Sequence, residues 1–140
     1  MNHSQKAKWI ICACILLVVL SSGISVYRHL RPSRGLPYEK VTMEQAQAYM
    51  EYEKDYYLVD ISDEKIYQEG HIPGALCIPY DSLLGQAAGM LPDKTAIVYI
   101  CGSSAKKCDK ACRKLCELGY TGVTFLGLVK KWPGELERKK

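Results

Sequence analysis

Sequence patterns of a metal site or a disulfide scaffold are absent from this 140-residue chain. It has seven cysteines, but none forms a CxxC pair, and no spacing of cysteine and histidine fits a zinc site. Cys108, Cys112 and Cys116 are spaced for a single helix, so they are not expected to pair with one another. The sequence therefore predicts free thiols, and with them a reducing compartment or deliberate thiol chemistry.

Internal repeats, low-complexity tracts and a strong charge are absent as well. The formal net charge of +4 is small, and the basic residues are scattered apart from one cluster, which argues against nucleic-acid binding. About 100 residues follow the N-terminal segment, enough for one small domain with a single core.

The longest uncharged stretch of the sequence lies near the N-terminus. Residues 9–27 contain no charge, and at helical rise they span roughly 28 Å, close to the thickness of a bilayer core. Trp9 and Tyr27 stand at its two ends, where aromatic side chains favour the membrane interface. We expect a basic leader at 1–8, a transmembrane or signal-anchor segment at 9–27, a linker at 28–37, a domain at 38–137 and a polar tail at 138–140.

Two properties of this segment stay open. Small residues around Gly23 also fit a signal peptide cut near that position and a secreted product, although apolar residues resume at Ile24 and favour an uncleaved single-pass anchor. Basic residues flank both ends of the segment, so orientation is nearly balanced. The short basic leader favours a domain outside the cytoplasm, whereas the free thiols and three following arginines favour the opposite side. Of the two, we expect the extracytoplasmic side.

The remaining chain alternates between strand and helix patterns. Thr42 with Gln45 forms a capping box at the start of a helix whose apolar positions share one face. Strands are expected at 56–61, 75–78, 95–100 and 123–126, and helices at 63–69 and 106–118, the two helices ending at Gly70 and Gly119. This alternation predicts an α/β fold with a parallel sheet flanked by helices.

Cys101 stands at the carboxyl end of the strand expected at 95–100, where parallel sheets bind ligands. Small residues follow it, and a loop of this kind before a helix binds anions through inward-pointing amides. Between Cys101 and Cys116 there are five basic residues and one acid. These features predict a thiolate at Cys101 with a pKa below the usual value of about 8.5, suited to nucleophilic attack. The alternative is a buried strand-end cysteine with solvated lysines nearby.

Several motifs occur in order along residues 38–137: the strand ending at Asp60, "YQEGHIPGA" at 67–75, the strand leading to Cys101, "LGY" at 118–120, and Gly127 followed by Trp-Pro-Gly at 132–134. On these motifs, residues 38–137 resemble the rhodanese-like domain family. This resemblance implies an α/β fold and sulfurtransferase activity without a metal or organic cofactor. It also implies that Cys101 accepts sulfur from a small anionic donor (thiosulfate, a polysulfide or a persulfide) and passes the persulfide sulfur to a thiol, another nucleophile or a partner protein.

The same resemblance assigns the anion-binding loop to the residues after Cys101, namely Gly102, Ser103, Ser104, Ala105, Lys106 and Lys107. The usual family loop is C-x-x-G-x-R, and here Ser104 and Lys106 replace its glycine and arginine. Lysine keeps the charge but loses the bidentate fork of arginine. Ser62 also replaces a usual arginine, and the stretch from Cys101 to Gly119 is one residue longer than the common form, so Lys107 is an alternative to Lys106 as the ligand-facing cation.

Three further residues each allow two interpretations. Cys108 lies on the apolar stripe of its expected helix, which favours core packing, with a resolving thiol or a soft-metal ligand as the alternative. His71 belongs to a structural turn in the family motif, with acid–base chemistry as the alternative. Asp60 is expected to fix turn groups at its strand end rather than act as a general base.

Three functions are consistent with the sequence. The first is a membrane-anchored sulfurtransferase that works through a Cys101 persulfide. The second is a non-catalytic, rhodanese-like binding or regulatory module. The third is an enzyme acting on phosphate or arsenate, since Cys101 to Lys107 has the length of a C-x5-R oxyanion loop, although no arginine ends it.

Overall fold

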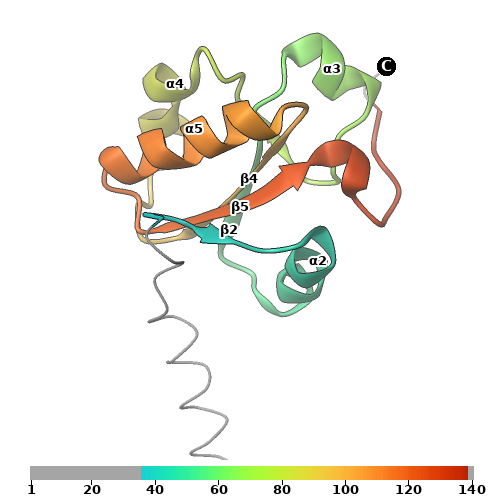
Figure 1. Cartoon of the computed structure of the whole chain (residues 1–140), viewed down its shortest axis with the longest axis horizontal. Coiled ribbons are helices and arrows are strands. Elements are labelled where there is room, and N and C mark those ends of the chain that lie inside the picture. Colours follow the sequence, from blue (N-terminus) through green and yellow to red (C-terminus); the bar gives the residue numbers. More distant parts are fainter. Residues whose placement is uncertain (1–35, 139–140) are drawn as a thin grey trace, which may run out of the picture. The chain divides into compact units, whose positions relative to one another are not determined.

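A computed structural model describes residues 36–138, which form a parallel five-stranded sheet with helices on both faces (Figure 1). The strand order is β1-β5-β4-β2-β3, and all four neighbouring pairs are parallel. The strands are β1 (Glu39–Lys40), β2 (Tyr56–Asp60), β3 (Leu76–Cys77), β4 (Ile97–Gly102) and β5 (Gly122–Leu128). The helices are α2 (Met43–Tyr52), α3 (Glu64–Glu69), α4 (Leu83–Met90), α5 (Ala105–Glu117) and the 3-10 helix η1 (Val129–Lys131). The predicted fold class is confirmed.

Helices α4 and α5 cover one face of the sheet, and α2 and η1 cover the other (Figure 1). Each face has its own apolar core, because the side chains of a strand point alternately to the two sides. Along β4, Val98 and Ile100 pack under α4 and α5, whereas Tyr99 and Cys101 pack under α2 and η1. Strand β4 is thus buried on both sides, as its continuous apolar run predicts.

Local sequence signals placed most elements correctly. Thr42 and Gln45 exchange both hydrogen bonds of the predicted capping box, and α3 ends against Gly70. On α5, four residues of the predicted apolar stripe are fully buried. They are Cys108, Ala111, Cys112 and Leu115.

Two boundaries differ from the sequence prediction in a way that matters for the site. Strand β4 continues to Gly102, two residues beyond the predicted end, because it pairs with β5 as far as Leu128. Helix α5 begins at Ala105 instead of Lys106, since Ser104 caps it. Helix α4 was missed because its segment is uncharged and contains two glycines, so its amphipathic pattern is weak.

The predicted leader, the apolar segment at 9–27 and most of the predicted linker lie outside the described residues. Within residues 36–138, no helix is both long and apolar enough to span a bilayer.

Two glycine substitutions should change the stability of this fold in opposite directions. A Cβ at Gly122 would lie 2.7 Å from the carbonyl oxygen of Ala96 and 3.1 Å from the Cα of Ile97, so Gly122→Ala forces two backbones apart. We expect a loss of about 1–3 kcal/mol in the free energy of unfolding. Gly85 in α4 has nothing within 4 Å of its added Cβ, and Gly85→Ala should gain about 0.5–1 kcal/mol. Urea denaturation followed by circular dichroism measures both; equal effects would contradict the close approach of β5 to the chain before β4.

Candidate active site

The candidate site lies at the carboxyl edge of the sheet, where β2 and β4 end beside each other. Asp60 of β2 pairs with Cys101 of β4 in the parallel register, and Gly102 pairs with Leu128 of β5. Helix α5 begins three residues beyond Gly102. The residues singled out from the sequence are therefore close in the fold, but they do not share one surface.

Cys101 points away from α5, into the core beneath α2 and η1. Its side chain has no solvent exposure and packs in the cluster that contains Met43, Ala46 and Val129. Its Sγ donates a hydrogen bond to the backbone carbonyl of Val59, 3.5 Å away. The thiol is enclosed in protein and has no open path to a solute.

The prediction of a lowered pKa at Cys101 is wrong. Burial raises the pKa of the Cys101 thiol well above its ordinary value, and the nearby Asp60 and Cys108 raise it further. The basic residues of α5 do not offset this effect, because α5 covers the opposite face of the sheet. Cys101 is therefore a neutral thiol at physiological pH, and a neutral thiol is a poor nucleophile.

Gly102, instead of Cys101, occupies the strand end below the start of α5. A Cβ at Gly102 would lie 3.2 Å from Cys108 Sγ, 3.6 Å from the amide nitrogen of Ser62 and 2.9 Å from Cγ1 of Ile61. If the family loop C-x-x-G-x-R is counted back with Lys107 as its cation, its first position also falls on Gly102. In the sequence, this one-residue offset between Cys101 and the first loop position is visible as the extra residue between Cys101 and Gly119.

The predicted anion loop is shorter than expected, because half of it belongs to α5. Ser103 is exposed, and Ser104 is the N-cap, whose Oγ accepts a hydrogen bond from the amide of Lys107 at 3.4 Å. Ala105, Lys106 and Lys107 form the first turn of the helix and are exposed. The Lys107 ammonium lies 5.8 Å from the ring centroid of Tyr80. The positive end of α5 and Lys106 thus face solvent with no thiol beside them.

Asp60 and Ser62 form a buried polar pair that sequence reasoning did not identify as such. Asp60 is 1% exposed and Ser62 is 3% exposed. Asp60 Oδ1 accepts a hydrogen bond from the Ser62 amide at 2.9 Å, as its predicted turn-fixing role requires. Asp60 Oδ2 and Ser62 Oγ have no hydrogen-bond partner among the described residues. Desolvation raises the pKa of the Asp60 carboxyl.

His71 ties the chain after α3 to the C-terminal segment. Its ring stacks on Tyr67 with centroids 3.8 Å apart, and its Nδ1 lies 2.8 Å from the Tyr67 carbonyl. Its backbone exchanges two hydrogen bonds with Glu137, and its Nε2 lies 3.6 Å from a Glu137 carboxylate oxygen. These are the contacts of a structural residue.

Cys108 packs on the inner face of α5, in the core on the other side of the sheet from Cys101. Burial, followed by the charge of Asp60, raises the pKa of Cys108 to about 12. Its Sγ donates to the Gly127 carbonyl at 3.8 Å. A resolving role stays a prediction, and it would require the two thiols to meet across β4.

Among residues 36–138, no cluster of three or more His, Cys, Asp or Glu side chains could hold a metal ion. The exposed part of the site therefore offers backbone amides, two serine hydroxyls and lysine ammonium groups. Groups of these kinds at a helix N-terminus favour anions.

A family model described as "Rhodanese-like domain" matches residues 42–132. The Escherichia coli K12 thiosulfate sulfurtransferase PspE is 31% identical over 72 residues, which cover 51% of this chain and 69% of that protein. A crystal structure of the Anabaena protein Alr3790 is 25% identical, with a TM-score of 0.66 over 71% of this chain and 92% of that one. A structure titled "rhodanese with anions from E. coli" is 26% identical, with a TM-score of 0.56 over 59% of this chain and 98% of that one.

Thiol alkylation should separate Cys101 from the partly exposed Cys116. Both are thiols, but Cys101 is enclosed, whereas Cys116 is only half-buried. A short iodoacetamide pulse at pH 8, followed by peptide mass spectrometry, should label Cys116 at least tenfold more than Cys101, because alkylation needs a reachable thiolate. Preferential labelling of Cys101 would contradict the burial described above.

Asp60 should make stability depend on pH. Its folded pKa is raised by burial, so the native state holds the proton more tightly than the unfolded chain. Its contribution to stability is present below the unfolded pKa of about 3.9 and is lost as pH rises through the folded pKa. We expect Asp60→Asn, which keeps the acceptor for Ser62, to be close to wild type at low pH and relatively more stable as pH rises. Urea midpoints measured across this range test it, and a constant difference would refute it.

Proposed function

Because the chain belongs to the rhodanese-like domain family, we propose that it works as a rhodanese-like binding module in which no cysteine at the sheet edge catalyses sulfur transfer. The observation that carries this proposal is the enclosure of Cys101 on the side of β4 away from α5. The position at the strand end below α5 belongs to Gly102, which has no side chain to react.

Sulfur transfer makes demands that this arrangement does not meet. The attacking sulfur must be ionised and must approach the outer sulfur of the donor while the leaving anion departs. Cys101 is neutral and has no exposed surface. Reaction at Cys101 would first require the side chains packed over it, which include Met43, Ala46 and Val129, to move aside.

The feature that supports anion binding is the exposed first turn of α5. The first turn of α5 presents backbone amides at the positive end of the helix, and Ser103 and Lys106 lie beside it in solvent. The similar E. coli structure is titled as a rhodanese with anions. We propose that a small anion, or an anionic group of a partner protein, binds at residues 102–107 without reacting.

A sulfurtransferase remains the second candidate, favoured by the similarity to the thiosulfate sulfurtransferase PspE. In this function the Cys101 thiolate attacks the outer sulfur of thiosulfate, a polysulfide or a persulfide. A new Cys101–sulfur bond forms, the donor's sulfur–sulfur bond breaks, and the remainder leaves as an anion. An acceptor thiolate or another nucleophile then removes the outer sulfur and restores Cys101.

We also propose that residues 9–27 tether the domain to a membrane as a single-pass anchor. The supporting observations are their lack of charge, their length and the aromatic residues at both ends. Flotation of the full chain with phosphatidylcholine vesicles tests this tether.

Exposure to a sulfane donor should leave Cys101 unmodified. The full chain in detergent would be treated with thiosulfate or a polysulfide and mapped by mass spectrometry, with PspE as the positive control. We expect no added sulfur on Cys101. In NMR spectra, thiosulfate should shift the amides of residues 103–107 equally in wild type and in Cys101→Ser. Added sulfur at position 101 that disappears in Cys101→Ser would establish the second candidate.

A further inference from the structure

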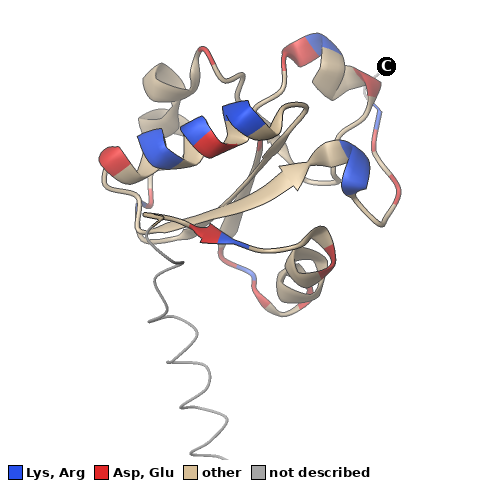
Figure 2. Cartoon of the chain, viewed as in Figure 1, with Lys and Arg blue, Asp and Glu red and all other residues tan. Residues whose placement is uncertain are grey.

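The outer side of α5 is a strongly basic surface. Lys106, Lys107 and Lys110 are exposed, and Lys114 is half-buried beside them (Figure 2). The Lys107 and Lys114 ammonium groups flank the Tyr80 ring, at 5.8 Å and 4.6 Å from its centroid. We call these four lysines the α5 lysine face.

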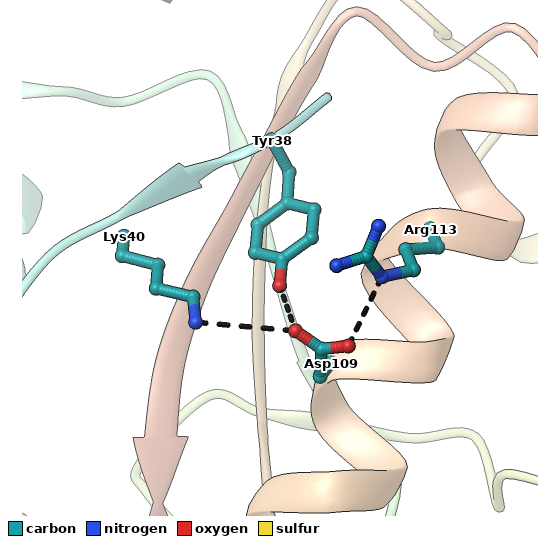
Figure 3. Close-up of polar contacts among 4 residues, drawn as sticks. All are labelled: Tyr38, Lys40, Asp109 and Arg113. Atoms are coloured by element: carbon teal, nitrogen blue, oxygen red, sulfur yellow. Dashed lines mark hydrogen bonds and ion pairs between the residues drawn. The ribbon is translucent and has the colours of Figure 1, made fainter. Parts of the chain in front are cut away.

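The acid within this stretch of α5 does not neutralise the α5 lysine face. Asp109 accepts a hydrogen bond from Tyr38 and pairs with Arg113 at 3.1 Å and Lys40 at 3.9 Å (Figure 3). Figure 3 shows this carboxylate between Tyr38 and Lys40 on one side and Arg113, one turn further along α5, on the other. Lys40 and Arg113 balance the charge of Asp109, and none of the four lysines forms a salt bridge within residues 36–138.

Charge is distributed unevenly over the domain. Residues 36–100 contain eleven acidic and four basic side chains, whereas α5 contains five basic and two acidic ones. Helix α2 carries Glu44 and Glu51 and no basic residue, and it covers the sheet face opposite α5 (Figure 2). A negatively charged surface would therefore attract the α5 side of the domain and repel much of the rest.

Helix α4, which lies beside α5 over the same sheet face, adds apolar surface without charge (Figure 1). No residue of α4 is charged, and Leu84 and Met90 are 50% and 37% exposed. An uncharged helix with exposed apolar side chains next to a lysine-rich helix matches the interface of a bilayer, where lysines meet headgroups and apolar groups enter the boundary below them.

The chain also enters the domain beside α5. Leu36 packs against the core under α5, and the Pro37 carbonyl accepts a hydrogen bond from Cys116 Sγ at 3.3 Å. Ten residues, 28–37, separate the uncharged segment from the domain, and at full extension they reach at most roughly 35 Å. A domain tethered by residues 9–27 thus stays within reach of the bilayer surface.

We propose that the α5 lysine face, with Leu84 and Met90, docks the domain onto the anionic headgroups of the membrane that holds its N-terminal segment. This inference rests on the tether proposed above. Docking turns the lysines to the lipid and the acid-rich side of the domain, with α2, away from it. The first turn of α5 then lies at the headgroup layer, so membrane composition controls access to the proposed anion site.

Lysine acetylation in vesicles tests the orientation. The full chain would be reconstituted into phosphatidylcholine vesicles with or without about 30 mol% phosphatidylserine as the anionic lipid. An amine-reactive acetylating reagent would then be added briefly on the side of the membrane that carries the domain. We expect Lys106 and Lys110 to be labelled several-fold more slowly in anionic vesicles, and about 0.5 M salt should abolish the difference. Two exposed lysines away from α5, Lys54 just after α2 and Lys65 in α3, should label equally in both vesicle types.

A variant with Lys106, Lys107, Lys110 and Lys114 all changed to Gln provides the matched control. Its circular dichroism melt should resemble wild type, and its Lys130 and Lys131 should label equally in both vesicle types. Failure of the wild-type chain to float with either vesicle would refute the tether. Flotation with equal labelling of the α5 lysines in both lipids would refute the docking alone. Protection that persists in detergent would assign this face to a second copy of the chain or to another protein, and would also overturn the proposal.

Discussion

The alternation of side chains along β4 decides the chemistry of this domain. Hydrogen bonding to β2 on one side and β5 on the other fixes which face each β4 residue meets. A one-residue shift of β4 that moved Cys101 to the α5 face would also move Tyr99 and Ile100 to the faces opposite those they occupy. Enclosure of the thiol therefore depends on a single residue step along β4, at the point where its pairing with β5 shifts register between Ile100 and Cys101.

The same constraint separates charges that are adjacent in the sequence. Lys106 and Lys107 follow Cys101 closely along the chain, but they lie on the far side of the sheet from its sulfur. The nearest ionisable partner of Cys101 is Asp60, whose negative charge opposes ionisation of the thiol. Desolvation raises the pKa of both Cys101 and Asp60, whereas α5, over the other face of the sheet, presents its lysines to solvent.

Local signals in the sequence were sufficient for most of the fold. The Thr42 capping box, the apolar run of β4 and the cysteine stripe of α5 each depend on a few neighbouring residues, and each is present as predicted. Helix α4 depends on burial of Leu83 and Ala87 under α5, a tertiary contact that its weak pattern did not reveal.

The geometry of the site was harder to predict from the sequence, because the position of Cys101 relative to the loop depends on where β4 ends. That end is set by pairing with β5 and not by local propensity. The enclosure of Asp60 and Ser62 likewise follows from the packing around them.

Gly102 has a consequence for how this protein could change over evolutionary time. Its backbone directs an absent side chain towards Ile61 and Cys108, and the shortest contact is with a flexible side-chain carbon instead of backbone. A change from glycine to cysteine at this position would bring a second sulfur close to Cys108, after the Ile61 side chain had moved aside. Because Gly102 is buried, such a thiol would face the core beneath α5 and would need an opening to solvent before it could meet a solute.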